Sequence, residues 1–448
     1  MDAREVRLEA ELTTRLSERA EALASLGSLS EDSPVLSEAE RASLARLTER
    51  LANTYPYGEP RYVGQMLKPP HPLAWAAYAT AMLLNPNNHA LDGGPATAEM
   101  EREAVAAIAT LFGLPSPLGH LTSSGTIANL EALWVARELQ PDKTVLYGEN
   151  AHYTHERMCA VLGIAGESVA QDELGRIDTA VLERRLAAGD VGTVVATLGT
   201  TSLGALDDVA AIAALCAAHG ARLHVDAAYG GFFALLADGG DPGVLATPFA
   251  ALARADSIVV DPHKHGLQPY GCGCVLFADP AVGRLYAHDS PYTYFTSREL
   301  HLGEISLECS RAGAAAAALW TTFDALPLTR SGLGAALAQS RSAATAVAAE
   351  LERSELELVV EPQLDILCPF PHATSAAEIT ARCEAAFDSL ARAGWHAAKL
   401  RVSTDWLRRR HDWIEPDEAE VTTLRLVLMK PSHAAIATQL AAVLREHL

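Results

Sequence analysis

Short apolar runs alternate with longer amphipathic stretches through the middle of the chain. Helical periodicity is found over 72–84, 96–112, 126–139, 153–163, 178–187 and 207–218. The apolar runs are Val145-Leu146, Thr193–Thr197, Arg222–Val225, Ser257–Val260 and Cys274–Phe277. Strands that alternate with helices of roughly 10–15 residues are typical of a mostly parallel sheet with helices on both faces. The pattern therefore predicts an α/β domain from residue 72 to about residue 325.

The pattern changes on either side of this region. Residues 1–55 predict two amphipathic helices, followed by a Pro-rich extended passage up to residue 71. The C-terminal part predicts helices over 332–353 and 375–393, strands over 355–361, 364–370, 396–402 and 422–429, and a final helix. Strands with antiparallel pairing among helices indicate an α+β unit. We therefore divide the chain into an N-terminal segment (1–71), a large domain (72–328) and a small α+β domain (329–448).

Composition narrows the class of protein. The 448 residues carry a formal charge of -21, whereas a nucleic-acid binder would carry a basic stripe. The N-terminus lacks the layout of a signal peptide, and no run has the roughly 18 consecutive apolar residues of a spanning helix. We expect a cytoplasmic protein that binds neither nucleic acid nor membrane. The seven cysteines are too sparse for a disulfide framework, so we expect free thiols, with Cys272 and Cys274 in the core, and no metal site.

A lysine stands at the mouth of two apolar strands. Lys264 lies in the sequence Asp-Pro-His-Lys, directly after Ser257–Val260 and before Cys272. An ammonium group is costly to desolvate, and in an apolar site its pKa falls, which suits a lysine that forms imines. A single lysine of this kind is more often salt-bridged or reaches to solvent. Other motifs in the sequence must therefore decide whether Lys264 is structural or binds a cofactor.

Two further motifs complete a pattern. Asp226 ends the run LHVD, at the edge where open α/β sheets bind ligands. The turn Ser124–Thr126 opens a helix and presents N–H groups to an anion. A third segment, NAHYTHERM, places His152 and Tyr153 at the start of another helix. An anion cradle, a carboxylate and an imine-forming lysine match the phosphate, the pyridine nitrogen and the aldehyde of pyridoxal 5'-phosphate. We therefore predict this cofactor.

The same motifs resemble the pyridoxal-phosphate-dependent group II amino-acid decarboxylases, over roughly residues 60–430. The blocks NPNNHALDGGPATAEMEREAV, GHLTSSGTIANLEALWVAREL and CSRAGAAAAALW carry the likeness, which is strong toward bacterial tyrosine decarboxylases and archaeal tyrosine/aspartate relatives. The resemblance implies fold type I, that of aspartate aminotransferase, and a homodimer with shared active sites. It also implies a carboxy-lyase that converts an L-amino acid, either aromatic like tyrosine or small and acidic, to the amine and CO2.

The resemblance implies a role for each matching residue. Lys264 would be the Schiff-base lysine, Asp226 would keep the pyridine nitrogen protonated, and His152 and Ala228 would lie on opposite faces of the ring. Ser124, Gly125 and Thr126 would bind the phosphate near His263, and Thr201 would contact the cofactor or the substrate carboxylate. His152 could instead serve only to start its helix.

Other positions are open. Tyr292 and Tyr294 are both candidates to protonate the product, and we favour Tyr292 because it follows a proline. Tyr62, Asn87, His89 and Arg425 are candidates for substrate binding, with Gln65 and His71 in the same segment; Arg425 could instead anchor its strand by a salt bridge. His265 departs from the family pattern, where many members have an aromatic or aliphatic residue. An aldehyde-forming oxidative deaminase, a carbon–carbon lyase and a non-catalytic scaffold protein are the alternative functions.

Overall fold

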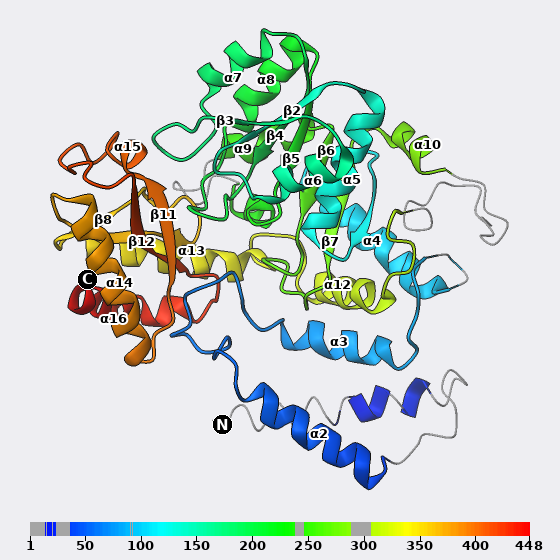
Figure 1. The fold of residues 1–448 in the computed structure, drawn as a ribbon. Helices are drawn as coiled ribbons and strands as arrows, with labels where there is room; N and C mark the ends of the chain where they lie inside the picture. The colour runs from blue at the N-terminus through cyan, green and yellow to red at the C-terminus, as the bar shows by residue number, and fades with distance from the viewer. Residues whose placement is uncertain are drawn as a thin grey trace.

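The computed structural model describes residues 36–89, 91, 93–237, 246–287 and 306–448, together with parts of 14–23. Figure 1 shows a central sheet flanked by helices, and beside it a smaller unit built from the C-terminal strands and helices. In the described part of the chain, no helix is both long enough and apolar enough to cross a bilayer.

The central sheet has seven strands in the order β1-β7-β6-β5-β4-β2-β3. They are β1 (Leu118–Thr122), β2 (Thr144–Gly148), β3 (Gly166–Val169), β4 (Val191–Thr197), β5 (Arg222–Asp226), β6 (Ser257–Val260) and β7 (Gly273–Phe277). Neighbours from β6 to β3 are parallel, whereas β7 runs antiparallel to both β6 and β1. The predicted α/β sheet is confirmed, and so is fold type I, since the overall likeness reported below is to decarboxylases of that fold.

Sequence analysis missed two strands of this sheet. β1 contains a glycine and a histidine, so it does not form a continuous apolar run. β3 is mostly exposed and has the sequence GESV, which carries no apolar signal before its last residue. Both are edge strands of the sheet.

Helices cover the sheet, and five of them, α4 to α8, lie close to predicted positions, whereas α9, α10 and α12 were not predicted. They are α4 (Pro95–Leu111), α5 (Gly125–Leu139), α6 (Thr154–Leu162), α7 (Thr179–Leu186), α8 (Val209–His219), α9 (Ala246–Ala250), α10 (Gly283–Tyr286) and α12 (Gly313–Ala325). Local sequence sets their ends: Asp178 and Asp208 cap α7 and α8, and α6 and α8 stop at glycines with positive φ, Gly163 and Gly220. α12 had not been predicted, because its Ala-rich sequence is buried along almost its whole length and shows no amphipathic period.

The C-terminal unit contains antiparallel strands packed on helices, as predicted. Its elements are α13 (Gly334–Leu351), β8 (Leu356–Leu358), β9 (Ile366–Leu367), β10 (Pro369–Pro371), α14 (Ala376–Arg392), β11 (Ala398–Ser403), α15 (Thr404–Leu407), β12 (Glu420–Val427) and α16 (His433–His447). β12 lies between β11 and β9, and β10 pairs with β8.

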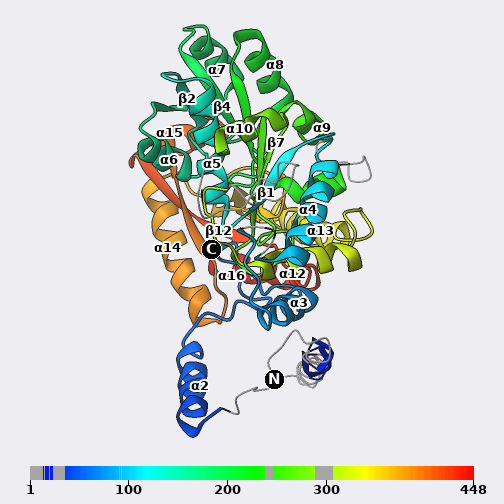
Figure 2. The same ribbon diagram turned by 90° about the vertical axis from the view of Figure 1, so that its right-hand side faces the viewer.

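The helix α2 (Glu38–Leu51) stands apart from this body (Figure 2). It begins with a capping box formed by Ser37 and Glu40, and none of its residues is buried. Figure 2 shows it projecting below the rest of the molecule, beyond α3 (Pro72–Met82).

All seven cysteines are free thiols, and six of them are buried. Cys272 and Cys274 lie in the core, where burial raises the pKa of both thiols. Among the described residues no group of three or more ligands could hold a metal ion.

Candidate active site

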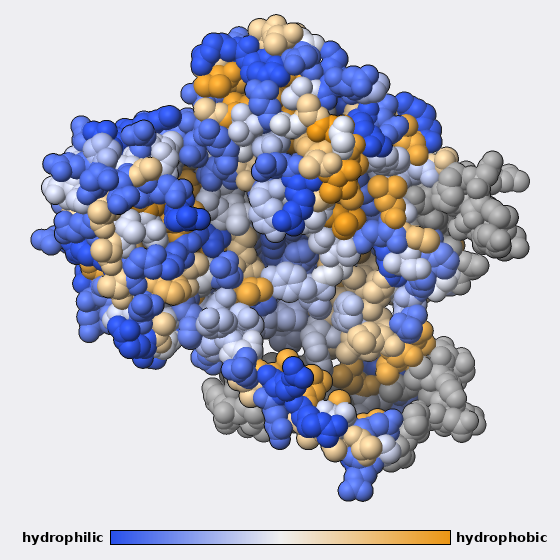
Figure 3. All heavy atoms as spheres, in the orientation of Figure 1, coloured by the Kyte–Doolittle hydropathy of each residue, from blue (hydrophilic) through white to orange (hydrophobic). Residues whose placement is uncertain are grey.

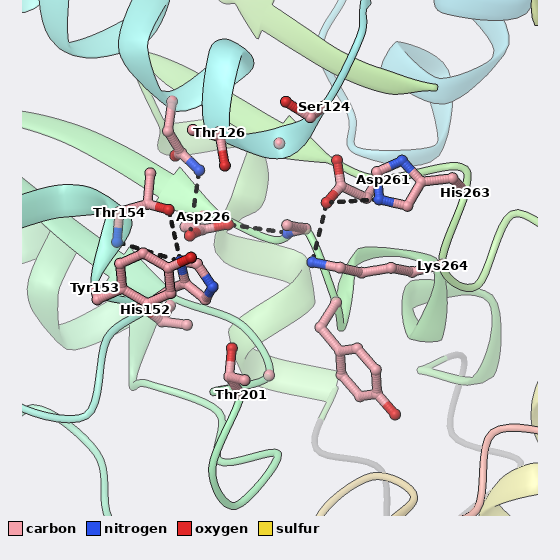
Figure 4. A pocket seen from close by; sticks show the side chains of 16 residues that line it. Ser124, Thr126, His152, Tyr153, Thr154, Thr201, Asp226, Asp261, His263 and Lys264 are labelled. Atoms are coloured by element: carbon pink, nitrogen blue, oxygen red, sulfur yellow. Dashed lines mark hydrogen bonds and ion pairs between the residues drawn. The ribbon is translucent and has the colours of Figure 1, made fainter. Parts of the chain in front are cut away.

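A cavity of about 240 Å³ opens where β4, β5 and β6 end. It is lined by Ser124, Gly125, Thr126, Asn129, His152, Tyr153, Thr154, Thr197, Gly199, Thr201, Asp226, Ala228, Tyr229, Asp261, His263 and Lys264. All nine residues that were predicted to bind the cofactor are in this set. Figure 4 shows Lys264 and His152 pointing into the cavity from opposite sides, with Asp226 between them and Ser124 and Thr126 along one wall.

Asp226, at the end of β5, is held from three directions. His155 Nε2 donates to its Oδ2 (2.9 Å), Asn129 Nδ2 donates to the same oxygen (3.4 Å), and the N–H of Ala228 donates to Oδ1 (3.1 Å). Burial acts to raise the pKa of this carboxyl group, but the hydrogen bond from His155 and the charges of His155 and Lys264 outweigh it. The pKa therefore lies well below its usual value, and Asp226 is ionised at neutral pH.

A chain of polar groups behind Asp226 fixes the orientation of Asn129. Burial lowers the pKa of His224 to about 3, so its ring is neutral. His224 Nε2 lies 2.8 Å from Asn129 Oδ1 and can only donate to it, while His224 Nδ1 accepts from the Ser257 hydroxyl (2.9 Å). The Asn129 amide nitrogen is thereby turned toward Asp226. Sequence analysis missed Asn129 and His155; the spacing of His152 and His155, one helical turn apart in NAHYTHERM, was the available signal.

The start of α5 forms a wall of the cavity next to Asp261, in the turn that carries Lys264 (Figure 4). Ser124 Oγ caps α5 by accepting a hydrogen bond from the Ile127 N–H group (3.4 Å), and the first residue of α5 is Gly125. A Cβ atom at Gly125 would lie 2.6 Å from Asp261 Oδ2, so only glycine lets the helix approach this carboxylate so closely. The N–H groups of this first turn have no partner within the helix and offer an anion site.

Lys264 lies in a turn directly after β6, and its ammonium group contacts Asp261. Lys264 Nζ is 3.0 Å from Asp261 Oδ2, and His263 Nε2 is 3.5 Å from the same oxygen. The Lys264 side chain retains 20% exposure, so the amine is accessible from the cavity. Asp261 belongs to the Asp-Pro-His-Lys motif, but sequence analysis treated it only as part of the turn. His263 is held by a contact between its Nδ1 and the Cys272 carbonyl (2.8 Å).

His152 contacts the start of α6 and also lines the cavity. Its Nδ1 accepts from Thr154 N–H (3.2 Å) and lies 2.6 Å from Thr154 Oγ1, so it does help to start α6. Its ring also lines the cavity, across from Lys264. Burial lowers the pKa of His152, which favours an uncharged ring.

Comparison with known proteins gives a consistent result. A family described as the pyridoxal-dependent decarboxylase conserved domain matches residues 73–370. The chain belongs to this family. Curated relatives include a probable L-aspartate decarboxylase of Halobacterium salinarum, 31% identical over 78% of this chain and 90% of its own length. They also include a probable L-tyrosine/L-aspartate decarboxylase of Methanothermobacter thermautotrophicus, 29% identical over 69% and 83%. The solved tryptophan decarboxylase of Catharanthus roseus shares the fold, with a TM-score of 0.75, 19% identity and coverage of 100% and 99%.

Membership makes this protein a carboxy-lyase that depends on pyridoxal 5'-phosphate, and the cavity of this decarboxylase fits the cofactor. Two buried oxygens in its wall, Asp261 Oδ1 and Thr197 Oγ1, have no hydrogen-bond partner among the described residues. An ionised carboxylate, Asp226, suits a protonated pyridine nitrogen, and the start of α5 suits a phosphate. Unsatisfied buried polar atoms are costly, so a polar ligand in this cavity would remove that cost.

The predicted substrate residues of the decarboxylase do not line this cavity. Tyr62 is buried among Tyr55, Tyr57 and His396. Asn87 accepts from the N–H groups of His89 and Arg311, which holds a loop beside α12. Tyr292 and Tyr294 lie outside the described residues.

Arg425 and His265 are two of the residues whose roles the sequence left open. Arg425 Nε donates to the carbonyl of Ser202 (3.2 Å), next to the cavity residue Thr201. In the described chain no carboxylate lies within ion-pair distance of Arg425, and its Nη2 has no partner there. His265 is buried, and burial with the charges of Lys68 and Lys264 holds its pKa well below the usual value. It is therefore a neutral group rather than a basic one.

Proposed function

We propose that this protein decarboxylates L-aspartate or L-tyrosine to the corresponding amine and CO2. The proposal is carried by one observation: Lys264, Asp226 and the start of α5 face a single cavity in the arrangement that the cofactor's three functional groups require. The printed names of the curated relatives supply the two substrates.

When bound, pyridoxal 5'-phosphate supplies a ring that accepts the electrons of the breaking carbon–carbon bond. In our proposal the residues of this chain prepare that ring. Lys264 holds the cofactor covalently through Nζ, and Asp226 keeps the ring nitrogen protonated by its fixed negative charge. The first turn of α5 with His263 binds the phosphate, and His152 and Ala228 hold the two faces of the ring.

The Arg425 guanidinium is the proposed contact for a substrate carboxylate. It is buried, it has an unused donor within the described chain, and it bonds the residue next to Thr201. A buried guanidinium without a carboxylate favours an anionic ligand. Tyr62, Asn87 and His89 remain proposed substrate contacts only if the cavity extends toward them in the assembled enzyme.

The proposal is tested by assaying the purified, cofactor-loaded protein against the proteinogenic L-amino acids. CO2, amine and aldehyde should be measured separately, with and without O2. We expect stoichiometric amine and CO2 from aspartate or tyrosine. Aldehyde and ammonia with O2 consumption would identify an oxidative deaminase instead, and absence of CO2 with every amino acid would overturn the proposal.

We also propose a homodimer, supported by an uncovered apolar face. Leu44, Leu47 and Leu51 follow one side of α2 and are 51%, 51% and 60% exposed. Trp75 and Met82 on α3 are likewise exposed, and Figure 3 shows apolar residues on the helices at the lower edge of the molecule. An amphipathic helix that buries nothing against its own chain needs another surface, and a second copy offers one with two-fold reciprocity.

The domain division at residues 71/72 and 328/329 also remains a proposal. It is supported by the position of the second boundary in the connection between α12 and α13, after the last helix that packs on α3 and α4.

A further inference from the structure

A buried cluster connects the C-terminal unit to the turn that carries Lys264. Asp365, immediately before β9, is fully buried and accepts a hydrogen bond from the Tyr229 hydroxyl (2.6 Å) at Oδ1. His265 Nε2 lies 3.3 Å from Asp365 Oδ2. Tyr229 follows the cavity residue Ala228 and lines the cavity itself, and His265 follows Lys264. One carboxylate of the C-terminal unit thus contacts both segments that flank the proposed cofactor site.

The histidine has no other polar contact. Neither ring nitrogen has the geometry of a hydrogen bond to a described residue, so the approach of Nε2 to Asp365 Oδ2 is a close polar contact. The ring packs edge-on against Tyr229 (4.7 Å between centroids) and Phe233 (4.9 Å). An apolar side chain would satisfy this pocket without leaving ring nitrogens unpaired, since buried polar groups without partners cost stability. The polar character of residue 265 is therefore directed at Asp365.

Asp365 is itself rigidly placed. Its carbonyl accepts from Leu428 N–H (2.8 Å), and β9 pairs with β12 immediately afterwards. A Cβ atom added at Gly199 or at Gly230 would lie only 3.1 Å from Cδ1 of the neighbouring Leu364. The C-terminal unit therefore fits closely against the loops of the cavity. The turn that carries Lys264 is also tightly packed, because a Cβ atom at Gly266 would lie 2.6 Å from Pro262 Cα.

The buried carboxylate carries a cost that packing does not explain. Burial raises the pKa of Asp365 to about 6, against the opposing hydrogen bond from Tyr229 and the charge of Lys68. Lys68, Arg341 and Arg425 are the cationic groups whose charges act on it, and Tyr229 and His265 are the titratable groups that touch it. A group with a raised native pKa destabilises the protein as the pH rises through that range. A residue that costs stability is expected where function requires it.

We propose that Asp365 is a positioning residue: through His265 and Tyr229 it fixes the turn of Lys264 and the loop of Ala228 relative to the C-terminal unit. The inference rests on the proposed function, because the geometry that it protects is that of the lysine and the ring-facing alanine. A small displacement of such groups is expected to cost rate rather than binding.

The test is the variant Asp365→Asn, which keeps the shape and keeps an acceptor for Tyr229 but loses the charge. We expect it to unfold at a temperature equal to or above that of the wild type at pH 8, because the cost of the buried charge is gone. At the same time the pH midpoint at which the visible absorbance of bound cofactor titrates should move down, since a negative charge near Lys264 is lost. kcat should fall about tenfold or more, with a much smaller change in KM.

A second pair of variants tests the histidine. His265→Gln retains a neutral hydrogen-bond donor and should keep near-wild-type cofactor absorbance and kcat. His265→Leu fills the same apolar pocket without a donor and should reproduce the defects of Asp365→Asn. Equal behaviour of the two variants would mean that residue 265 acts only by packing, and would overturn the proposal.

The chain provides a matched control. Glu131 accepts from Tyr286 (3.0 Å) and contacts His120 Nε2 (2.8 Å), which repeats the same trio of side chains outside the cavity lining. Glu131→Gln should lower thermal stability without moving the cofactor titration. If Asp365→Asn and Glu131→Gln behave alike, Asp365 is only structural and the inference fails. If wild-type protein binds no pyridoxal phosphate, the proposed function itself fails.

Discussion

Asp226 is ionised although it is buried, and this combination shows how single residues make the cavity reactive. A carboxylate in a dry site would normally take up a proton, but donors from His155, Asn129 and the backbone of Ala228 stabilise the charge. Lys264 differs from Asp226, because among the described residues only Asp261 forms an ion pair with its ammonium group and the side chain reaches the cavity. Asp226 is thus fixed and charged, whereas Lys264 is available to react.

At this scale we predict that Lys264→Ala folds but cannot hold the cofactor covalently. Borohydride reduction should give no labelled adduct, and kcat/KM should fall on the order of 10³-fold or more, because no other amine replaces it. Mass spectrometry of the reduced protein measures the adduct directly. Retention of a reducible adduct in the variant would move the role to another lysine.

The choice between Tyr292 and Tyr294 is also decided by single substitutions. We predict that Tyr292→Phe still releases CO2, since loss of CO2 does not need the hydroxyl group, but protonates the product carbon poorly. The ratio of amine to aldehyde should then fall, whereas Tyr294→Phe should change it much less. An unchanged ratio in the first variant with a lowered ratio in the second would assign the donor to Tyr294.

At the scale of elements, the strand ends and helix starts bring these side chains together. β4, β5 and β6 are parallel and adjacent, so Thr197, Asp226 and Asp261 leave the sheet at the same edge. α5 approaches that edge with its first turn because Gly125 leaves room for Asp261. The geometry of the site therefore depends on how closely α5 can approach the turn that contains Asp261.

We predict that Gly125→Ala weakens cofactor binding by about tenfold or more, equivalent to roughly 1.4 kcal/mol, because the added methyl group would overlap Asp261. Fluorescence titration of the apoprotein with pyridoxal phosphate measures this affinity. The control is Gly58→Ala, whose Cβ would come no closer than 3.4 Å to Pro69. Equal affinities for the two variants would show that the approach of α5 does not matter.

At the scale of the whole molecule, the exposed leucines of α2 are the feature that a single chain leaves unexplained. We predict a particle of about twice 47.5 kDa in sedimentation equilibrium. Leu44→Glu with Leu47→Glu should shift the particle toward monomer and reduce activity, because charges on the apolar face oppose its burial.

Ala42→Glu adds a charge on the opposite side of the same helix and is the control for this prediction. It should leave both the mass and the activity unchanged. A wild-type enzyme that is fully active as a monomer would contradict the homodimer, and an unaltered dimer in the double variant would place the interface away from α2.

Sequence alone determined the alternation of strands and helices, the family and the nine residues around the cofactor cavity. The alternation depends on local pattern, since apolar runs mark buried strands, and glycine and hydroxyl residues mark the starts of helices. The family and the nine residues were implied by the resemblance of whole motifs to the decarboxylases. Each predicted cofactor residue lies in a loop that follows a strand or at the start of a helix, and the topology of a parallel sheet collects these positions at one edge.

Only the tertiary structure decided which distant side chains serve those residues. Asn129 and Asp261 line the cavity, and His155 bonds Asp226 from outside the lining, although the sequence does not say which side chains these residues contact. Asp365 lies 101 positions beyond Lys264 and contacts its turn only because β9 docks against the loops of the large sheet. Hydrogen-bond partners across a core are set by packing and register, and burial then sets their charge, so neither can be obtained from the order of residues along the chain.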